Sequence, residues 1–272
     1  MNGAMEVGVT LRNMGPQSQA EWMRQGLLHA EGLGFESVWI TDHIAIPPDD
    51  AEGSGGRYTD PLTTLSWFAG MTQTIKLGTG VLILPYRPIL PTAKAIATLQ
   101  ELSGNRLVLG VGIGWMDAEF KALGLSRADR GRVSDATLEF LRDCFSQDEV
   151  TLNDQPFLFK PRPAAPPILV GGRPPHALTR ATALADGWLP MVRSPEQLRP
   201  DIERYRQLTD AAGRPPGQVT VMTGLGSDMD QAGQLLAEYA ALGVTRVVAA
   251  VTYQSMDEYC AYLDQLAGII NA

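Results

Sequence analysis

Short runs rich in Val, Ile and Leu alternate along the chain with longer stretches that have helical spacing. The runs lack the strict apolar–polar alternation of a half-exposed strand, as is typical of strands buried on both faces of a parallel sheet. We expect such strands at Glu6–Thr10, Ser37–Thr41, Lys76–Ile83, Arg106–Val111, Ile168–Val170, Gly187–Pro190, Gln218–Thr223 and Arg246–Val251. We expect helices at Gln17–Gly32, Pro61–Thr72, Pro91–Leu102, Val133–Phe145, Pro174–Ala185, Pro195–Ala211, Met229–Leu242 and Met256–Ala267. This alternation predicts an α/β fold, a (β/α)8 TIM barrel.

The length of the chain suits one such barrel. Its 272 residues, 44% of them hydrophobic, can build one large core, so we expect a single domain over residues 1–272. The connections at 44–58 and 112–167 are long and should be insertions over the C-terminal face of the barrel. The second connection should contain a short helix near Ala118–Leu123 and a hairpin over Val150–Phe159. A doubly wound sheet is the alternative, but its usual glycine-rich first strand–helix turn is missing here.

The net charge and the composition of the chain exclude several classes of partner and function. A net charge of -8 repels phosphodiester backbones, so we expect no nucleic-acid partner, although a local site can still hold a small anion. The two distant cysteines, Cys144 and Cys260, make neither a disulfide framework nor a thiolate metal cluster. The three histidines have no metal-type spacing, and we expect no metal. With no signal-peptide pattern and no apolar run of ~18 residues, the chain is expected to be cytoplasmic and to have no membrane segment.

Two of the predicted strands contain residues that do not suit a buried sheet. The second strand ends in Asp42 and His43, which either bind a ligand and move a proton or serve as a turn cap and a structural histidine. The third contains Gly78 and Gly80, which weaken a buried strand unless a bulge or a close ligand requires them. A kink at a barrel corner is the alternative there. Because barrel sites are built at strand C-termini, both positions are candidates for the functional site.

Glycine-rich turns follow the fourth and fifth strands. Residues 110–115 read GVGIGW, which fails the dinucleotide fingerprint because Trp115 stands where its last glycine belongs. Gly112 and Gly114 therefore fit a close approach of backbone to ligand better. The Gly-Gly-Arg run at 171–173 leads into a helix, whose free N-terminal amides favour a phosphate or another anion. An ordinary strand–helix turn is the alternative.

With these residues the chain resembles a known family. The matching stretches include GFESVWITDH, IKLGTGVLILPYRP, NRLVLGVGIGW, ADRGR and PPILVGGRPPHALTRATALADGWLPM, in family order over about residues 1–191. The chain is similar to the bacterial luciferase-like flavin and deazaflavin oxidoreductases, and within them to the single-barrel, F-420-dependent subgroup. The last third of the chain agrees in pattern but has no distinctive motif.

The resemblance implies one flavin-type cofactor at the strand C-termini, with Asp42 and His43 as a catalytic pair near its ring. It also implies a non-prolyl cis peptide at Gly80–Val81 behind the ring and a phosphate at the turn after the fifth strand. Arg106 should flank the site. The cofactor-binding residues carried over from this pattern are Thr79, Gly80, Val81, Asn105, Gly112, Gly114, Gly171, Gly172 and Arg173.

The expected function is hydride transfer between the deazaflavin coenzyme F-420 and a small organic substrate, with His43 giving or taking the proton. Arg57, Arg87 and Arg173 are candidates for holding the anionic tail of F-420; Arg87 could instead hold an anionic substrate or be solvated. By resemblance the protein should be a homodimer. One alternative is an FMN-dependent monooxygenase that uses O2, and another is a flavin-binding carrier or regulator without turnover. The short connection at 224–228 predicts an open pocket and leaves the substrate unidentified.

Overall fold

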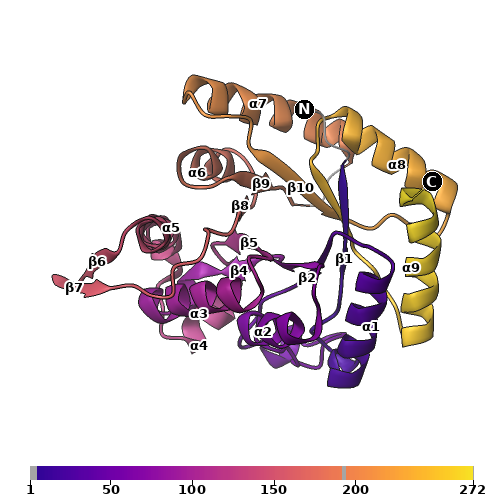
Figure 1. The fold of residues 1–272 in the computed structure, drawn as a ribbon, viewed down its shortest axis with the longest axis horizontal. Helices are drawn as coiled ribbons and strands as arrows, with labels where there is room; N and C mark the ends of the chain where they lie inside the picture. Colours follow the sequence, from indigo (N-terminus) through magenta and orange to yellow (C-terminus); the bar gives the residue numbers. More distant parts are fainter. Residues whose placement is uncertain (1–4, 192–193, 272) are drawn as a thin grey trace.

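Parallel strands close into a barrel inside a ring of helices, in a computed structural model that describes residues 5–191 and 194–271 (Figure 1). The strand order is β3-β2-β1-β11-β10-β9-β8-β5-β4, and a further pairing of β3 with β5 closes the ring. Because β3 and β4 share one place, the barrel has eight strand positions. The strands are β1 (Glu6–Thr10), β2 (Ser37–Ile40), β3 (Lys76–Thr79), β4 (Leu82–Ile83), β5 (Leu107–Gly112), β8 (Ile168–Gly171), β9 (Gly187–Leu189), β10 (Gln218–Thr223) and β11 (Arg246–Ala249).

A helix follows each strand position and covers the outside of the barrel. Local signals fix some of the starts: Ser194 and Gln197 form a capping box ahead of Pro195, and the Asp60 side chain accepts a hydrogen bond from the Thr63 amide. The helices are α1 (Ala20–Gly32), α2 (Pro61–Met71), α3 (Ile89–Leu102), α5 (Arg130–Ser146), α6 (His176–Leu184), α7 (Pro195–Ala211), α8 (Met229–Ala241) and α9 (Met256–Ile270).

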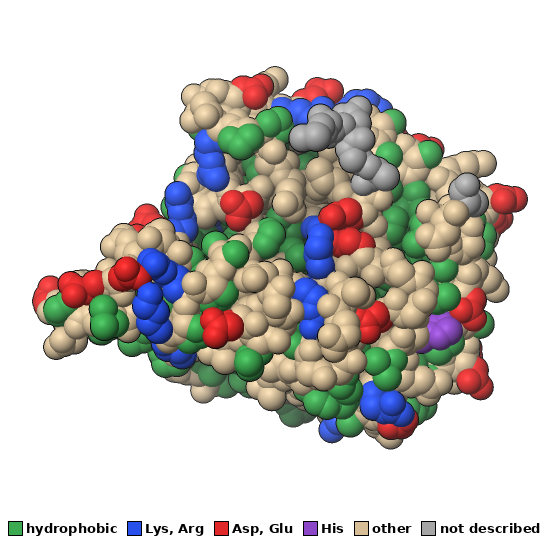
Figure 2. All heavy atoms as spheres, in the orientation of Figure 1, with side chains coloured by type: hydrophobic (Ala, Val, Ile, Leu, Met, Phe, Trp, Pro, Cys, Tyr) green, Lys and Arg blue, Asp and Glu red, His purple; other side chains and the backbone are tan. Residues whose placement is uncertain are grey.

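The predicted (β/α)8 barrel is confirmed, and its predicted elements end within three residues of the observed ones. The exception is the third strand, which breaks into β3 and β4 around Gly80 and Val81. The long second connection contains α4 (Asp117–Ala122) and a hairpin of β6 (Glu149–Leu152) and β7 (Gln155–Leu158). This hairpin projects from the body of the molecule (Figures 1 and 2). Within the described ranges, no helix is both long and apolar enough to cross a membrane.

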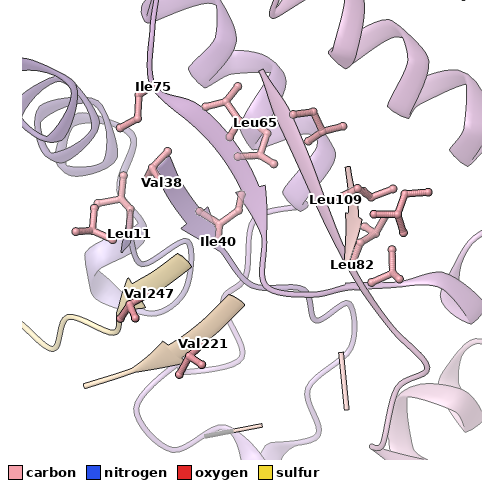
Figure 3. Close-up of a cluster of buried hydrophobic side chains, with 14 of the residues drawn as sticks. Leu11, Val38, Ile40, Leu65, Ile75, Leu82, Leu109, Val221 and Val247 are labelled. Carbon is pink, nitrogen blue, oxygen red and sulfur yellow. The ribbon is translucent and has the colours of Figure 1, made fainter. Parts of the chain in front are cut away.

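Alternation along each strand divides the buried side chains between two layers. The larger cluster packs between the strands and the helices, and Figure 3 shows Val38, Ile40, Leu109, Val221 and Val247 among its members. The residues at the alternate strand positions point inward and fill the inside of the barrel as a separate cluster. Its buried members are Trp39, Val108, Leu169, Leu189 and Val248.

A charged cluster closes the N-terminal end of the barrel. Arg246, 3% exposed, pairs with Glu6 and with Glu36, whose Oε1 lies 2.9 Å from Nη2 of Arg246. Lys76 contacts both carboxylates, at 3.1 Å for Glu6 and 2.7 Å for Glu36. This end is therefore sealed by ion pairs, which leaves the C-terminal end for a ligand.

Candidate active site

A cavity of about 480 Å³ opens at the C-terminal ends of the strands, a size that suits a small organic ligand. Its wall consists mostly of apolar side chains and glycine backbone from β2, the β3–β4 break, β5, β8, β9 and β10. A second cavity of about 600 Å³ lies outside the barrel, between α5 and the N-terminal ends of β8 and β9, and includes Ile168, Asp186 and Arg214. We place the site in the first cavity, because barrels of this kind carry their sites at the strand C-termini. The predicted site residues on its wall are Asp42, His43, Gly80, Val81, Gly112, Gly114, Gly171, Gly172 and Arg173.

Val81 forms the floor of this pocket, and two glycines make room for it. The Gly80–Val81 peptide is cis, as predicted. A Cβ atom on Gly112 would come within 2.5 Å of Val81 Cγ2, and one on Gly171 within 2.9 Å of Val81 Cγ1. The predicted residue Thr79 lies behind the wall, fully buried, and its hydroxyl donates to the Gly110 carbonyl at 2.7 Å. The glycines at the ends of β5 and β8 therefore serve one purpose, which is to make room for a single valine in the floor.

His43 stands on the pocket wall with its ring oriented by a buried carboxylate. Its Nδ1 lies 2.9 Å from Oε2 of Glu119, whose side chain is fully buried. The ring packs edge-to-face on Tyr58 at 5.0 Å and on Trp115 at 6.2 Å. Because the carboxylate accepts the Nδ1 proton, the neutral ring keeps its lone pair on Nε2. His43 can therefore take a proton at Nε2 and return it.

Glu119 is held as an anion by the groups around it. Burial alone would raise its pKa, but hydrogen bonds from the Ala45 and Ile44 amides, from His43 and from Tyr86 outweigh burial and lower that pKa. The amides donate to Oε1 at 3.0 and 2.6 Å, and the Tyr86 hydroxyl donates to Oε2 at 2.9 Å. Burial and the Glu119 carboxylate in turn raise the pKa of Tyr86, so it remains a donor. Glu119 also ties the loop after β2 to α4.

Sequence reasoning missed Glu119, although a signal was present. Met116, Glu119, Phe120 and Leu123 have the spacing of one helical face, and that face packs inward in the structure. An acid at a core-facing position of a short amphipathic helix needs a buried partner. The sequence predicts the helix but not the partner of its acid, because that partner, His43, is 76 residues away in the sequence.

Asp42 lies on the pocket wall, but both oxygens of its buried carboxylate are engaged by Arg87 and the β4 backbone. Its Oδ2 accepts from the Ile83 amide at 2.8 Å and from Arg87 Nη1 at 2.6 Å, and its Oδ1 accepts from Arg87 Nη2 at 2.9 Å. Arg87 also pairs with Asp60 at 2.8 Å. This geometry favours a positioning role for Asp42, which fixes the β3–β4 break, over the catalytic role expected from the sequence. It also corrects the expectation for Arg87, whose guanidinium is engaged with two carboxylates rather than with a ligand.

Three other residues that were expected at the site lie away from the pocket. Arg57 donates to the hydroxyl and carbonyl of Ser18, at 2.8 and 3.1 Å, and does not line the pocket. Asn105 and Arg106 precede β5, whereas the pocket lies at its far end, about 20 Å away for a strand of this length. Arg106 instead binds backbone carbonyls, including that of Ile75 at 2.8 Å. A motif next to a strand does not reveal which end of that strand carries the ligand.

The turn at 171–173 faces the pocket from β8. Gly172 has φ 131°, its carbonyl accepts from the Trp188 indole at 2.9 Å, and its amide donates to the Leu189 carbonyl at 3.2 Å. Pro174 and Pro175 carry no N–H, so fewer helix N-terminal amides are available than the sequence suggested. The amides of Arg173 and His176, together with the exposed Arg173 guanidinium, remain as anion donors at the mouth of the pocket.

The barrel and its C-terminal pocket, with one oriented histidine and an anion-binding turn, define a (β/α)8-barrel protein with a ligand site at the strand C-termini. The chain belongs to the luciferase-like monooxygenase family, whose model matches residues 5–263. The resemblance seen in the sequence is thereby confirmed.

Relatives and solved structures agree with this placement. An uncharacterised protein of Mycobacterium tuberculosis is 29% identical over 259 residues, covering 88% of this chain and 90% of the relative. Monooxygenase RslO1 from Streptomyces bottropensis has a TM-score of 0.83 at 20% identity, covering 98% of this chain and 99% of that one. A coenzyme F420-dependent tetrahydromethanopterin reductase from Methanopyrus kandleri has a TM-score of 0.71 at 18% identity, with 97% and 98% covered. The FMN-bound oxygenating constituent of 3,6-diketocamphane monooxygenase from Pseudomonas putida has a TM-score of 0.79 at 13% identity, with 97% of each chain covered.

Proposed function

We propose that this protein is an oxidoreductase that uses coenzyme F-420 to transfer a hydride to or from a small organic substrate. The observation that carries the proposal is the division of the pocket: an anion-binding turn on β8, a flat floor at Val81, and a proton-transferring His43 on β2. A cofactor with a flat ring and a phosphate-bearing side chain would match this division, with the ring on Val81 beside His43 and the phosphate at the β8 turn. Arg173, exposed at the mouth, adds a cation for an anionic tail beyond the phosphate.

The residues present fit such a cofactor. A Cβ at Gly112 or Gly171 would force Val81 out of the floor, so the flat surface depends on the two glycines. The Arg173 and His176 amides would hold the phosphate. The deazaflavin, when bound, supplies the hydride chemistry. The protein then binds and orients the ring, excludes water with side chains such as Leu189 and Met222, and moves one proton at His43 Nε2.

Replacing Gly172 with valine should weaken cofactor binding ~10-fold or more, about 1.4 kcal/mol. Valine rarely adopts φ 131°, and its Cβ would lie 3.3 Å from the Cβ of Ala177, so the turn has to move. Fluorescence titration of the folded variant gives the affinity, and circular dichroism reports the barrel. Gly233→Ala on α8 is the control, because nothing lies within 4 Å of the added Cβ. A folded G172V protein with wild-type affinity would remove this turn from the cofactor site.

Titration with F-420 and with FMN tests the choice of cofactor. We expect F-420 to bind at least ~10-fold tighter than FMN. The difference should grow at low ionic strength, because the anionic tail adds charge that FMN lacks. Arg173→Gln should reduce this salt dependence for F-420 more than for FMN. Tighter FMN binding would overturn the proposal in favour of an FMN-dependent monooxygenase on the same residues, and binding without turnover of any substrate would favour a carrier.

A further inference from the structure

Arg12 is a cation beyond the C-terminal end of β1 that the proposed function does not use. It lies two residues beyond β1, and because Val9 in β1 and Leu11 after it pack outward at 0% and 1% exposure, alternation turns Arg12 toward the barrel axis. The side chain is partly buried. Unlike Arg57 and Arg87, its guanidinium meets no carboxylate and no hydrogen-bond acceptor among residues 5–191 and 194–271. A partly desolvated arginine without an anion indicates a place for one.

Two tyrosines connect Arg12 to the site. Its backbone amide donates to the Tyr253 hydroxyl at 3.1 Å. Its guanidinium acts on Tyr58 and Tyr253, where it opposes the rise that burial causes in the pKa of each phenol. The Tyr58 ring lies 5.0 Å from that of His43. Since β1 and β2 are paired neighbours, Arg12 and His43, which follow them, lie on the same side of the barrel, although Arg12 does not itself line the cavity.

The position of Arg12 argues against the tail of the cofactor as its ligand. In the closed order of strands, β1 is four places from β8 in either direction, so the two lie on opposite sides of the barrel (Figure 1). A cofactor with its ring in the pocket and its phosphate at the β8 turn would extend its tail outward from β8, away from β1. An anion at Arg12 therefore fits a second molecule bound near His43 better than the cofactor itself.

The remaining surface around the opening is apolar. Trp115 and Met191 line the pocket at 63% and 51% exposure, and Ile44 beside His43 is 45% exposed. Large apolar side chains exposed together at a pocket mouth mark a binding surface. We propose that the substrate has an apolar body, held against these side chains, and a carboxylate that pairs with Arg12 while the reacting atom faces His43. This rests on the proposed function in placing the cofactor at β8 and the proton transfer at His43.

Calorimetric titration of the full chain with 2-naphthoate and with its uncharged analogue 2-naphthamide tests the inference. Both probes offer the same apolar ring system, and only one offers a carboxylate. We expect the wild-type protein to bind 2-naphthoate at least ~10-fold tighter than 2-naphthamide. Arg12→Gln should abolish this preference without changing affinity for F-420 or FMN, and Arg12→Lys should retain part of it.

Matched variants separate the outcomes. Arg24→Gln removes an exposed charge on α1 and should leave the preference intact. Equal binding of the two probes by the wild type, or a preference that survives in R12Q, would overturn the role of Arg12. A preference that is lost in R173Q and kept in R12Q would place the carboxylate at the β8 turn instead. If neither cofactor binds, the proposed function fails, yet the ratio of the two probes in the cofactor-free protein still reports on Arg12.

Discussion

Replacing His43 with alanine is expected to lower kcat about 100-fold or more, the usual contribution of a positioned proton-transfer group. His43 lines the pocket, and its Nδ1 is engaged with Glu119 at 2.9 Å, which leaves Nε2 for the substrate. The floor at Val81 and the turn on β8 do not depend on the ring, so cofactor affinity should stay within about twofold of wild type. Steady-state kinetics and cofactor titration on the same preparation measure both quantities.

A double-mutant cycle separates catalysis by His43 from a merely structural role. Glu119→Gln can keep its oxygen on the Ile44 and Ala45 amides and present an amide N–H to Nδ1, so the Nε2 lone pair is lost. We expect kcat to fall in E119Q and the H43A/E119Q protein to be no slower than H43A, because Glu119 acts through His43. Wild-type turnover in H43A would make the histidine structural. Additive losses in the double variant would give Glu119 a separate function.

The hydrophobic pattern of the sequence and its helix-start and helix-end signals were enough to predict the barrel. Buried strands without alternation, separated by helices with recognisable caps, leave few topologies open. Asp42 and His43 could be placed at the pocket edge because they come directly after a strand whose centre, Val38–Ile40, is apolar. The break in the third strand was visible as glycine in an otherwise buried run, and the structure confirms it at Gly80–Val81.

The partners of the charged side chains could not be predicted in the same way. Arg87 is engaged by Asp42 and Asp60, and His43 by Glu119, through loops whose paths are fixed only when the barrel closes. An arginine in a sequence is therefore a candidate ligand group whether or not a carboxylate later neutralises it. Arg12 illustrates the reverse case: nothing in its sequence context marks it, and only the folded chain shows that no carboxylate of residues 5–191 and 194–271 reaches it.

The closed end of the barrel depends on Glu36 in a way that pH can reveal. Burial would raise the pKa of Glu36, but Arg246 and Lys76 outweigh burial and lower it from 4.5 to about 2. A carboxyl whose pKa is lowered on folding stabilises the protein above its unfolded pKa, and that contribution is lost as the pH falls toward the folded value. The stabilisation by Glu36 should therefore be complete near neutral pH and should decline below about pH 4.5.

Glu36→Gln is accordingly expected to lower the free energy of unfolding by about 3 kcal/mol at pH 7, because Arg246 stays buried with only the more exposed Glu6 to neutralise it. Urea unfolding followed by circular dichroism measures the loss. The difference in free energy of unfolding between wild type and variant should decrease steadily from pH 5 to pH 3. Glu21→Gln, which breaks the exposed Glu21–Arg24 pair, is the control and should have no measurable effect. If this difference is absent at pH 7, or does not change with pH, the ion pairs of Glu36 do not stabilise the protein. Activity should follow stability alone in E36Q, since the cluster and the pocket lie at opposite ends of the same strands.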